Sequence, residues 1–480
     1  MGTAPNPARS TVTVAAVSEP QIAESILDLV GDTPLVRLRK ISEGLPTVVV
    51  AKLETTNPGG SVKDRPAVAM IDAAERNGSL RPGGTIVEPT SGNTGVGLAI
   101  VAAQRGYRCI FVMSDKASVE KVALLEAYGA EVVVCPVAVA PEDPRSYYST
   151  AERIVTETRG AFRPDQYSNQ ANPLAHEQST GPELWRQTAG RITHFVAGIG
   201  TGGTITGVAR HLKERNPAVR IVGADPEGSV YSGGSGRPYL VEGVGEDFWP
   251  TTFDPSLIDE VIAVSDHDSF MLARRVARTE GLLIGGSGGT ALAGAMQVAA
   301  GARPDDLVVV LIPDSGRGYL SKIFDDRWMA SFGFLTSDGP TAGDVLTAKV
   351  PGGLPPLVYV RPEAQAREAV ELMRRHGVSQ LPVASGSLPL AAAEVLGAVD
   401  ELALMDLAFD EASVLDREVG EMMGPRLPTI GSGQPVAMAV ELLNHAPAVL
   451  VISGGRPCAV LTRTDVLRFL SERHDGPDPD

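Results

Sequence analysis

Short apolar, β-branched runs alternate with helix-like segments over about two thirds of this chain of 480 residues. The runs typical of strands lie at 48–53, 85–89, 108–113, 130–135, 194–199, 219–225 and 307–313. Between them, helical patterns cover 61–77, 92–105, 118–128, 173–189, 203–214 and 267–280. This alternation predicts βαβ units and a parallel sheet that is buried on both faces. Ligands of such folds bind beyond the carboxyl ends of the strands, so the loops that follow these runs are the candidate site.

The alternation stops near Trp328, and an internal repeat follows it. The stretch 332–343 is rich in Gly, Ser, Asp and Pro, which is typical of a linker. Beyond it, Ala-Val-Glu-Leu recurs at 369–372 and 439–442, each time in a β-α-β-β-α pattern. The predicted organisation is a disordered lead-in, a first domain, a linker, two repeats and a disordered tail, at 1–20, 21–331, 332–342, 343–411, 412–473 and 474–480.

Charge and cysteine content exclude several classes of function. The formal net charge of −16 argues against nucleic acid, because its phosphates need a basic surface. Three scattered cysteines indicate neither a disulfide framework nor a metal site, which favours a reducing cytoplasm. The N-terminal segment lacks the pattern of a signal peptide, and no apolar run has the length of a membrane helix. We expect a cytoplasmic protein that binds no metal, nucleic acid or membrane.

A glycine-rich loop follows the run 194–199. Gly198, Gly200 and Gly203 form a G-x-G-x-x-G between a strand and a helix, and Asp225 ends the next strand. This pattern matches a dinucleotide fingerprint, so a NAD-dependent dehydrogenase is one alternative, and a glycine-rich turn without a ligand is another. The composition of 200–204, Gly-Thr-Gly-Gly-Thr, favours a single terminal phosphate, because it offers successive backbone N–H groups and two hydroxyls.

Two further features suggest chemistry on an amino acid. Lys63 lies in the first turn of a predicted helix, where the helix dipole disfavours a cation. The loop 88–99 places four hydrogen-bonding side chains at another helix start, which suits a carboxylate: Thr90, Ser91, Asn93 and Thr94. An ordinary N-cap by Ser91 or Asn93 is the structural alternative, although a cap needs only one polar residue. An isolated lysine, a phosphate cradle and a carboxylate site together suit pyridoxal phosphate.

Four motifs, in order along the chain, carry a resemblance to a known family: NPGGSVKDR, EPTSGNTG, GTGGT and PDSGRGY. Together they resemble the cysteine synthase and cystathionine β-synthase family of pyridoxal phosphate enzymes, collinear over 22–335. The segments 165–176, 224–234 and 241–250 are similar to the cystathionine β-synthase branch, especially its actinobacterial members. The resemblance implies the two-lobed α/β parallel-sheet fold of the tryptophan synthase β-like (fold type II) enzymes over 21–331. The tail resembles a tandem CBS-domain (Bateman) module.

The resemblance also implies roles for individual residues. Lys63 is expected to form the Schiff base with the cofactor. The cofactor phosphate is expected to bind Gly200, Thr201, Gly202, Gly203 and Thr204. Asn93 is expected to face the phenolic oxygen of the cofactor ring and Ser315 its pyridine nitrogen, although the neighbouring Asp314 competes for that place. The expected substrate-binding residues are Thr90, Ser91, Thr94, Gln166 and Gly245, of which Gln166 has a structural role as its alternative.

The reaction that the resemblance implies is a β-replacement in which L-serine and L-homocysteine give L-cystathionine and water. The alternative is a cysteine synthase, which joins O-acetylserine or serine to sulfide. Glu246 stands where animal members carry an aromatic residue, so the homocysteine contacts of that loop do not transfer directly. Animal members bind haem through a Cys and a His ahead of the catalytic domain, and none precedes Cys109 here, so we expect no haem.

CBS domains bind adenosyl ligands through a Thr/Ser-x-x-Asp at the start of their last helix. The second repeat keeps Thr462 and Asp465 at these positions, whereas the first repeat has Asp400 and Ala403. We expect at most one site, for S-adenosylmethionine or an adenine nucleotide, on the second repeat. A module that serves only oligomer contacts and a non-catalytic adenosyl sensor are the alternatives. By the resemblance, the expected assembly is a homodimer or homotetramer.

Overall fold

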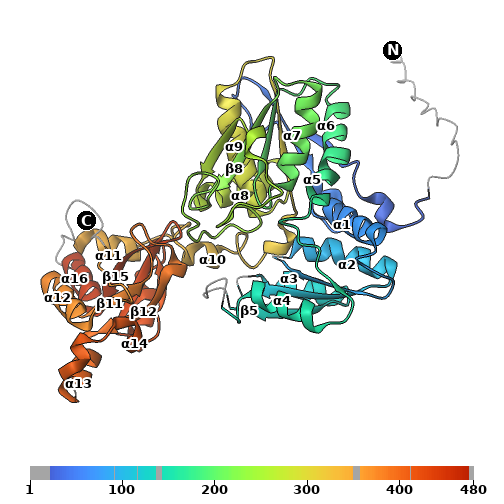
Figure 1. Ribbon diagram of the computed structural model, residues 1–480. Helices are drawn as coiled ribbons and strands as arrows, with labels where there is room; N and C mark the ends of the chain where they lie inside the picture. Colours follow the sequence, from blue (N-terminus) through green and yellow to red (C-terminus); the bar gives the residue numbers. More distant parts are fainter. Residues whose placement is uncertain are drawn as a thin grey trace, which may run out of the picture.

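The computed structural model describes residues 22–90, 92–115, 117–136, 143–349, 357–410 and 412–474. These residues form two α/β lobes and a C-terminal module (Figure 1). In Figure 1 the smaller lobe, mostly cyan, lies below the larger lobe, mostly green and yellow, and the module in orange and red lies to one side. Within the described ranges, none of the helices combines the length and apolar character that crossing a membrane requires.

The larger lobe is built on a six-stranded sheet in the order β1-β2-β10-β7-β8-β9, parallel except at β1. Its strands are β1 (Leu35–Arg37), β2 (Val48–Leu53), β7 (His194–Gly198), β8 (Arg220–Pro226), β9 (Glu260–Val264) and β10 (Leu307–Ile312). Val308 and Val310 enter one hydrophobic core, and Val309 and Leu311 enter another on the opposite face. Burial on both faces is why these strands are continuous apolar runs in the sequence.

Helices cover both faces of this sheet. On one face lie α8 (Asp266–Glu280) and α9 (Gly286–Gly301), and on the other lies α7 (Gly203–Arg215). The helix that the sequence predicts over 173–189 is divided into α5 (Ala171–Ala175), the π-helical turn η3 (His176–Thr180) and α6 (Gly181–Gln187). Backbone of this helix approaches α7 closely, since a Cβ on Gly207 would lie 2.0 Å from the carbonyl oxygen of Pro173.

The smaller lobe holds a four-stranded parallel sheet in the order β5-β4-β3-β6. The strands are β3 (Thr85–Pro89), β4 (Arg108–Ser114), β5 (Glu131–Cys135) and β6 (Ala161–Phe162). The helices α1 (Asp64–Asn77), α2 (Asn93–Arg105) and α3 (Val119–Ala127) share a core with this sheet. The helix α4 (Tyr147–Glu157) packs separately, with Ala151 against Val112 and Cys135.

The C-terminal module is an internal duplication. Its first repeat contains α12 (Ala366–His376), β11 (Gln380–Ala384), β12 (Val395–Asp400) and α13 (Glu401–Asp410). The second contains β13 (Thr429–Gly431), α15 (Val436–His445), β14 (Ala448–Ser453), β15 (Arg456–Thr462) and α16 (Arg463–His474). Each repeat has an antiparallel pair flanked by a parallel contact, β13 with β14 and Val360 with Val383. The exact domain boundaries stay a prediction.

Shorter elements connect these parts. The helix α10 (Asp326–Ser331) ends the larger lobe, α11 (Ala342–Lys349) packs on the second repeat, and α14 (Val419–Met422) lies between the repeats in sequence. Short 3₁₀ turns occupy Ile26–Leu29, Glu54–Thr56, Pro255–Leu257, Gly316–Tyr319, Ala392–Glu394 and Ala412–Asp416. The stretch that resembles a linker begins in the core, because Phe334 is buried against Phe270 and Trp328.

Candidate active site

Four loops at the carboxyl ends of strands bring the predicted residues together. Lys63 follows β2, Thr90 follows β3, the glycine loop 200–204 follows β7, and Asp314 follows β10. A cavity of about 220 Å³ is lined by Lys63, Thr90, Gln166, Gly200, Thr201 and Gly245. A small hollow beside it is lined by Lys63 and the glycine loop, and a third cavity contains Asn93 and Ser315. Ser91 lies outside the described residues, and Thr462 and Asp465 lie in the C-terminal module.

Lys63 stands directly before α1, one residue outside the helix whose first turn the sequence predicted for it. Its Nζ makes no hydrogen bond or ion pair with any residue that the structure describes. Burial lowers the pKa of this amine, and the negative charges of Asp314 and Glu246 oppose that shift. A lysine with a lowered pKa and no partner is available as a nucleophile and as a base.

The glycine loop forms a cradle that admits no side chain. Gly202 has φ +79° and faces Phe253, and a Cβ on Gly203 would lie 2.1 Å from Oδ1 of Asn172. The amide of Asn172 also donates to Oγ1 of Thr201 at 3.0 Å. Because α7 begins at Gly203, its free backbone N–H groups and its dipole favour an anion here. The loop therefore fits a phosphate group.

The loop after β3 is organised by hydrogen bonds that the sequence did not predict. The hydroxyl of Thr90 accepts from the backbone N–H groups of Gly92 and Gly95, so Thr90 takes the capping role considered for Asn93. Thr94 donates its hydroxyl to Oε1 of Gln166 at 2.6 Å. Gln166 therefore lies against this loop and is buried with it.

Asp314 and Ser315 point to different surroundings. The buried carboxylate of Asp314 accepts hydrogen bonds from Nδ2 of Asn93 at 2.8 Å and from the hydroxyl of Tyr319 at 2.6 Å. Ser315 is half-buried, and its hydroxyl accepts from the backbone N–H of Arg317 at 3.3 Å. Both residues line the cavity that also contains Asn93, and the carboxylate of Asp314 is already bound to protein partners there.

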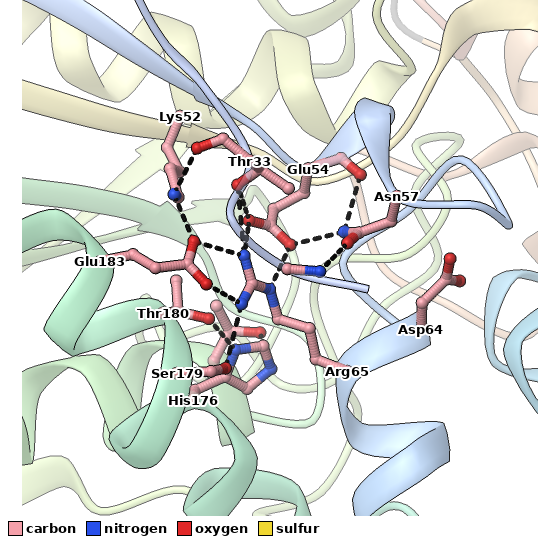
Figure 2. A network of polar contacts seen from close by, with 12 residues as sticks. Thr33, Lys52, Glu54, Asn57, Asp64, Arg65, His176, Ser179, Thr180 and Glu183 are labelled. Atoms are coloured by element: carbon pink, nitrogen blue, oxygen red, sulfur yellow. Dashed lines mark hydrogen bonds and ion pairs between the residues drawn. The ribbon is translucent and has the colours of Figure 1, made fainter. Parts of the chain in front are cut away.

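A buried charge network lies beside Lys63, and the sequence does not predict it. Figure 2 shows the guanidinium of Arg65 between the carboxylates of Glu54 and Glu183, at 2.7 Å from each. Glu183 also pairs with Lys52 at 2.6 Å, so two cations balance two anions away from water. Arg65 belongs to the motif that contains Lys63, but its partner Glu183 lies more than a hundred residues away in sequence. Only the folded chain reveals this pairing.

His176 connects this region to the glycine loop. Its ring is fully buried, with Nδ1 at 2.9 Å from the hydroxyl of Thr180 and Nε2 at 3.2 Å from that of Thr204. Burial holds the pKa of His176 well below its usual value, and the nearby charge of Arg65 lowers it further. The neutral ring is therefore a fixed hydrogen-bonding partner for Thr204.

The loop 239–246, which overlaps the motif segment 241–250 of the sequence, lines the same cavity. Gly245 has φ +76°, donates its N–H to the carbonyl of Ile199 at 2.7 Å, and leaves no room for a Cβ beside Tyr239. Glu242 is held by Lys121 at 2.7 Å and Lys322 at 2.6 Å. Glu246 also lines the cavity. Gly245 thus shapes the loop.

A partnerless lysine, a cradle for a phosphate and a loop for a carboxylate, at the carboxyl ends of parallel strands, fit a pyridoxal phosphate-dependent enzyme. Comparisons agree with this class. The model of the family described as pyridoxal-phosphate dependent enzyme matches residues 26–314, and that of the CBS domain matches 352–388 and 419–472.

Named relatives define the family further. Cystathionine β-synthase of Mus musculus is 42% identical over 395 residues, 79% of this chain and 69% of that protein. Cystathionine β-synthase of Dictyostelium discoideum is 37% identical over 466 residues, 94% of this chain and 92% of that protein. The crystal structure of O-acetylserine dependent cystathionine β-synthase from Helicobacter pylori is 37% identical, with a TM-score of 0.60, and covers 63% of this chain and 99% of that one.

The chain therefore belongs to the cystathionine β-synthase family of pyridoxal phosphate-dependent enzymes, with a C-terminal CBS domain pair. The predicted fold class and cofactor are confirmed. The family performs β-replacement on amino acids, and this chain is an enzyme of that type.

Proposed function

We propose that the enzyme condenses L-serine with L-homocysteine to L-cystathionine and water. The observation that carries the proposal is the position of Lys63, which lines both the phosphate cradle and the larger cavity. Its amine is partnerless among the described residues and has a lowered pKa. One amine can thus serve the cofactor and the substrate from the same place.

Pyridoxal phosphate, when bound, supplies an electron sink that allows a proton to leave Cα of an amino acid and a group to leave Cβ. We assign the phosphate to Gly200, Thr201, Gly202, Gly203 and Thr204, and the ring to Asn93 and Ser315. Because a hydroxyl carries no negative charge, Ser315 would stabilise a protonated ring nitrogen less than a carboxylate would. That milder sink favours prompt loss of the β-substituent over transamination.

Lys63 moves the protons in this scheme. Its neutral Nζ removes the Cα proton of serine, and the resulting ammonium returns a proton to the departing β-hydroxyl, which leaves as water. The thiol of the second substrate then forms the new Cβ–S bond and gives its proton to the neutral Nζ of Lys63, which returns a proton to Cα. Thr90, Ser91, Thr94 and Gln166 are the groups that we assign to the serine carboxylate, and Gly245 shapes the opposite wall.

The names of the relatives support homocysteine as the second substrate and leave one alternative reaction. Two proteins that resemble the chain over most of its length are cystathionine β-synthases. The Helicobacter pylori structure is described as O-acetylserine dependent, which favours O-acetylserine as a second electrophile to test. A cysteine synthase reaction, O-acetylserine or serine with sulfide, is the competing function.

A product assay separates these functions. The purified holoenzyme is supplied with serine and homocysteine, and separately with O-acetylserine and sulfide, and the products are identified by mass. We expect cystathionine from the first pair at a higher kcat/KM than cysteine from the second. Cysteine as the main product, with little or no cystathionine, would contradict the proposal.

We also propose one adenosyl site, on the second CBS repeat. Oδ2 of Asp465 accepts from the N–H of Thr462 at 2.9 Å and from its hydroxyl at 2.8 Å, and the Nζ of Lys349 lies at 3.1 Å. In the first repeat, Asp400 and Ala403 occupy the positions of Thr462 and Asp465, so both the hydroxyl and the carboxylate of the motif are missing from their places. The carboxylate of Asp400 instead accepts from the N–H of Ala403 at 2.8 Å. The adenosyl ligand would be S-adenosylmethionine or an adenine nucleotide.

Isothermal titration of the full chain with S-adenosylmethionine, and separately with ATP, counts the sites. We expect one site per chain for at least one ligand, abolished in Asp465→Asn. Two equivalent sites per chain, or binding that persists in this variant, would contradict the assignment. A homodimer or homotetramer and a cytoplasmic location remain our proposals for assembly and compartment.

A further inference from the structure

The cavity beside Lys63 is lined by two carboxylates whose surroundings differ. Glu242 is neutralised by the ammonium groups of Lys121 and Lys322. Glu246 is half-buried, and its carboxylate makes no hydrogen bond or ion pair with any residue that the structure describes. Glu246 is therefore the acid of this cavity whose carboxylate has no ion-pair partner among the described residues.

The backbone holds Glu246 in place on both sides of the residue. Its N–H donates to the hydroxyl of Ser229 at 3.0 Å, and its carbonyl accepts from the N–H of Val230 at 3.0 Å. The preceding Gly245 is tied to Ile199 by a hydrogen bond of 2.7 Å. The backbone of Glu246 is thus fixed by the loop, while its carboxylate has no partner of its own among the described residues.

An ionised acid that is largely withdrawn from water and has no partner is costly unless a cation binds to it. Burial, together with the charges of Asp247 and Asp225, raises the pKa of Glu246 from 4.5 to about 8, and the charge of Lys63 opposes this shift. The other titratable groups that sense Glu246 are Tyr231 and Tyr239. Below pH 8 this group is therefore mainly neutral, and a cation bound beside it would favour its ionised form.

The chemistry of β-replacement identifies that cation. The first amino acid commits its nitrogen to the cofactor and its carboxylate to the loop after β3. An amino-acid thiol brings a second ammonium group into the cavity, whereas sulfide brings none. The ammonium needs an anionic partner when it leaves water.

We propose that Glu246 binds the ammonium group of the thiol co-substrate and thereby selects an amino-acid thiol over sulfide. This inference rests on the proposed function. It adds a specificity-determining residue on the opposite side of the cavity from the loop that receives serine.

The test uses the holoenzyme of the wild type and of Glu246→Gln, which keeps the shape of the side chain. Serine is the first substrate, and three thiols are compared: homocysteine, 4-mercaptobutyrate, which lacks only the ammonium group, and sulfide. For Glu246→Gln we expect the KM for homocysteine to rise roughly tenfold or more, with kcat within about twofold. The parameters for 4-mercaptobutyrate and sulfide should stay within about twofold of the wild type.

A pH series gives a readout that a merely structural role would not move. In the wild type, the KM for homocysteine should fall as the pH rises toward 8, because ammonium binding must release the proton of Glu246. In Glu246→Gln this part of the pH dependence should be absent. The matched control is Glu43→Gln, the same substitution at an exposed residue outside the lining of this cavity, and it should leave the KM for homocysteine within about twofold.

The outcomes separate a failure of this inference from a failure of the proposed function. If the wild type makes cystathionine but Glu246→Gln keeps its KM for homocysteine, the inference is overturned and the proposed function stands. Equal losses with homocysteine and 4-mercaptobutyrate would likewise overturn it, because they would show a general effect on the cavity. If the wild type forms no cystathionine at all, the proposed function fails, and the inference fails with it.

Discussion

Asp64 follows Lys63 directly, and its Oδ1 is buried without a hydrogen bond from any part of the chain that the structure describes. Burial raises the pKa of this carboxyl from 3.8 to about 7. The folded protein therefore keeps a proton that the unfolded chain releases near pH 4. By linkage, this group lowers the free energy of unfolding as the pH rises from about 4 to 7, by at most about 1.4 kcal/mol per pH unit.

Asp64→Asn tests this prediction, because asparagine resembles the protonated carboxyl and does not titrate. We expect the melting temperature of the variant, relative to that of the wild type, to rise between pH 5 and pH 8. The measurement is thermal unfolding of both proteins across this range. A difference in melting temperature between the two proteins that stays constant from pH 5 to pH 8 would show that Asp64 ionises without a penalty.

At the scale of elements, the buried network in Figure 2 joins β2, α1 and α6. Replacing Glu183 with Gln leaves Lys52 and Arg65 with Glu54 as the one remaining carboxylate of the network. An uncompensated buried charge costs about 3–5 kcal/mol. We therefore expect Glu183→Gln to lower the free energy of unfolding of the first domain by about this amount. The measurement is denaturant-induced unfolding of the two proteins.

The matched control is Glu371→Gln, which breaks an exposed pair with Arg375 one helical turn away. Such a pair contributes about 0.5 kcal/mol or less, so this variant should unfold almost as the wild type does. If both variants lost the same small amount of stability, the network would not be the stabilising element that its burial suggests.

Individual elements show how far the sequence predicts the fold. The central strands were predicted nearly to the residue, since β2 matches its predicted bounds and β10 ends one residue early. These strands are buried on both faces, so their apolar runs carry a clear signal. The edge strand β6 and the π-helical turn at His176–Thr180 were missed, because two residues carry no periodicity and the turn depends on contact with α7.

The candidate site was predictable in the same uneven way. Lys63 and the glycine loop were identified because a cation at a helix start and an excess of glycine are unusual in themselves. His176 gave no signal, because its meaning comes from Thr204, which lies in another element. The sequence could not show that Glu246 lacks an ion-pair partner, because Lys121 and Lys322 reach Glu242 only in the folded chain.

At the scale of the whole molecule, Arg237 joins the larger lobe to the first CBS repeat. Its guanidinium pairs with Glu394 at 2.6 Å and donates to the carbonyls of Ser387 at 2.6 Å and Pro389 at 2.7 Å. Arg237→Ala removes all of these contacts. We expect limited proteolysis in the stretch 332–342 to accelerate about fivefold or more, because the module would separate more often from the lobe.

The control for this contact is Arg456→Ala, which removes a more exposed pair with Glu227 at 3.2 Å. Its cleavage rate should stay close to that of the wild type, since exposed pairs contribute little. Equal cleavage rates in the wild type and Arg237→Ala would mean that other contacts hold the module.

We assign Lys63 as the nucleophile and base of a β-replacement reaction. The most direct test measures cystathionine formation from serine and homocysteine by Lys63→Ala supplied with pyridoxal phosphate, with the exposed Lys40→Ala as control. We predict that Lys63→Ala loses at least about 10³-fold in kcat and the visible absorption of the lysine-bound cofactor, with an unchanged melting temperature. Lys40→Ala should match the wild type. A folded Lys63→Ala enzyme that kept a substantial part of the wild-type rate would show that Lys63 is not the nucleophile and base.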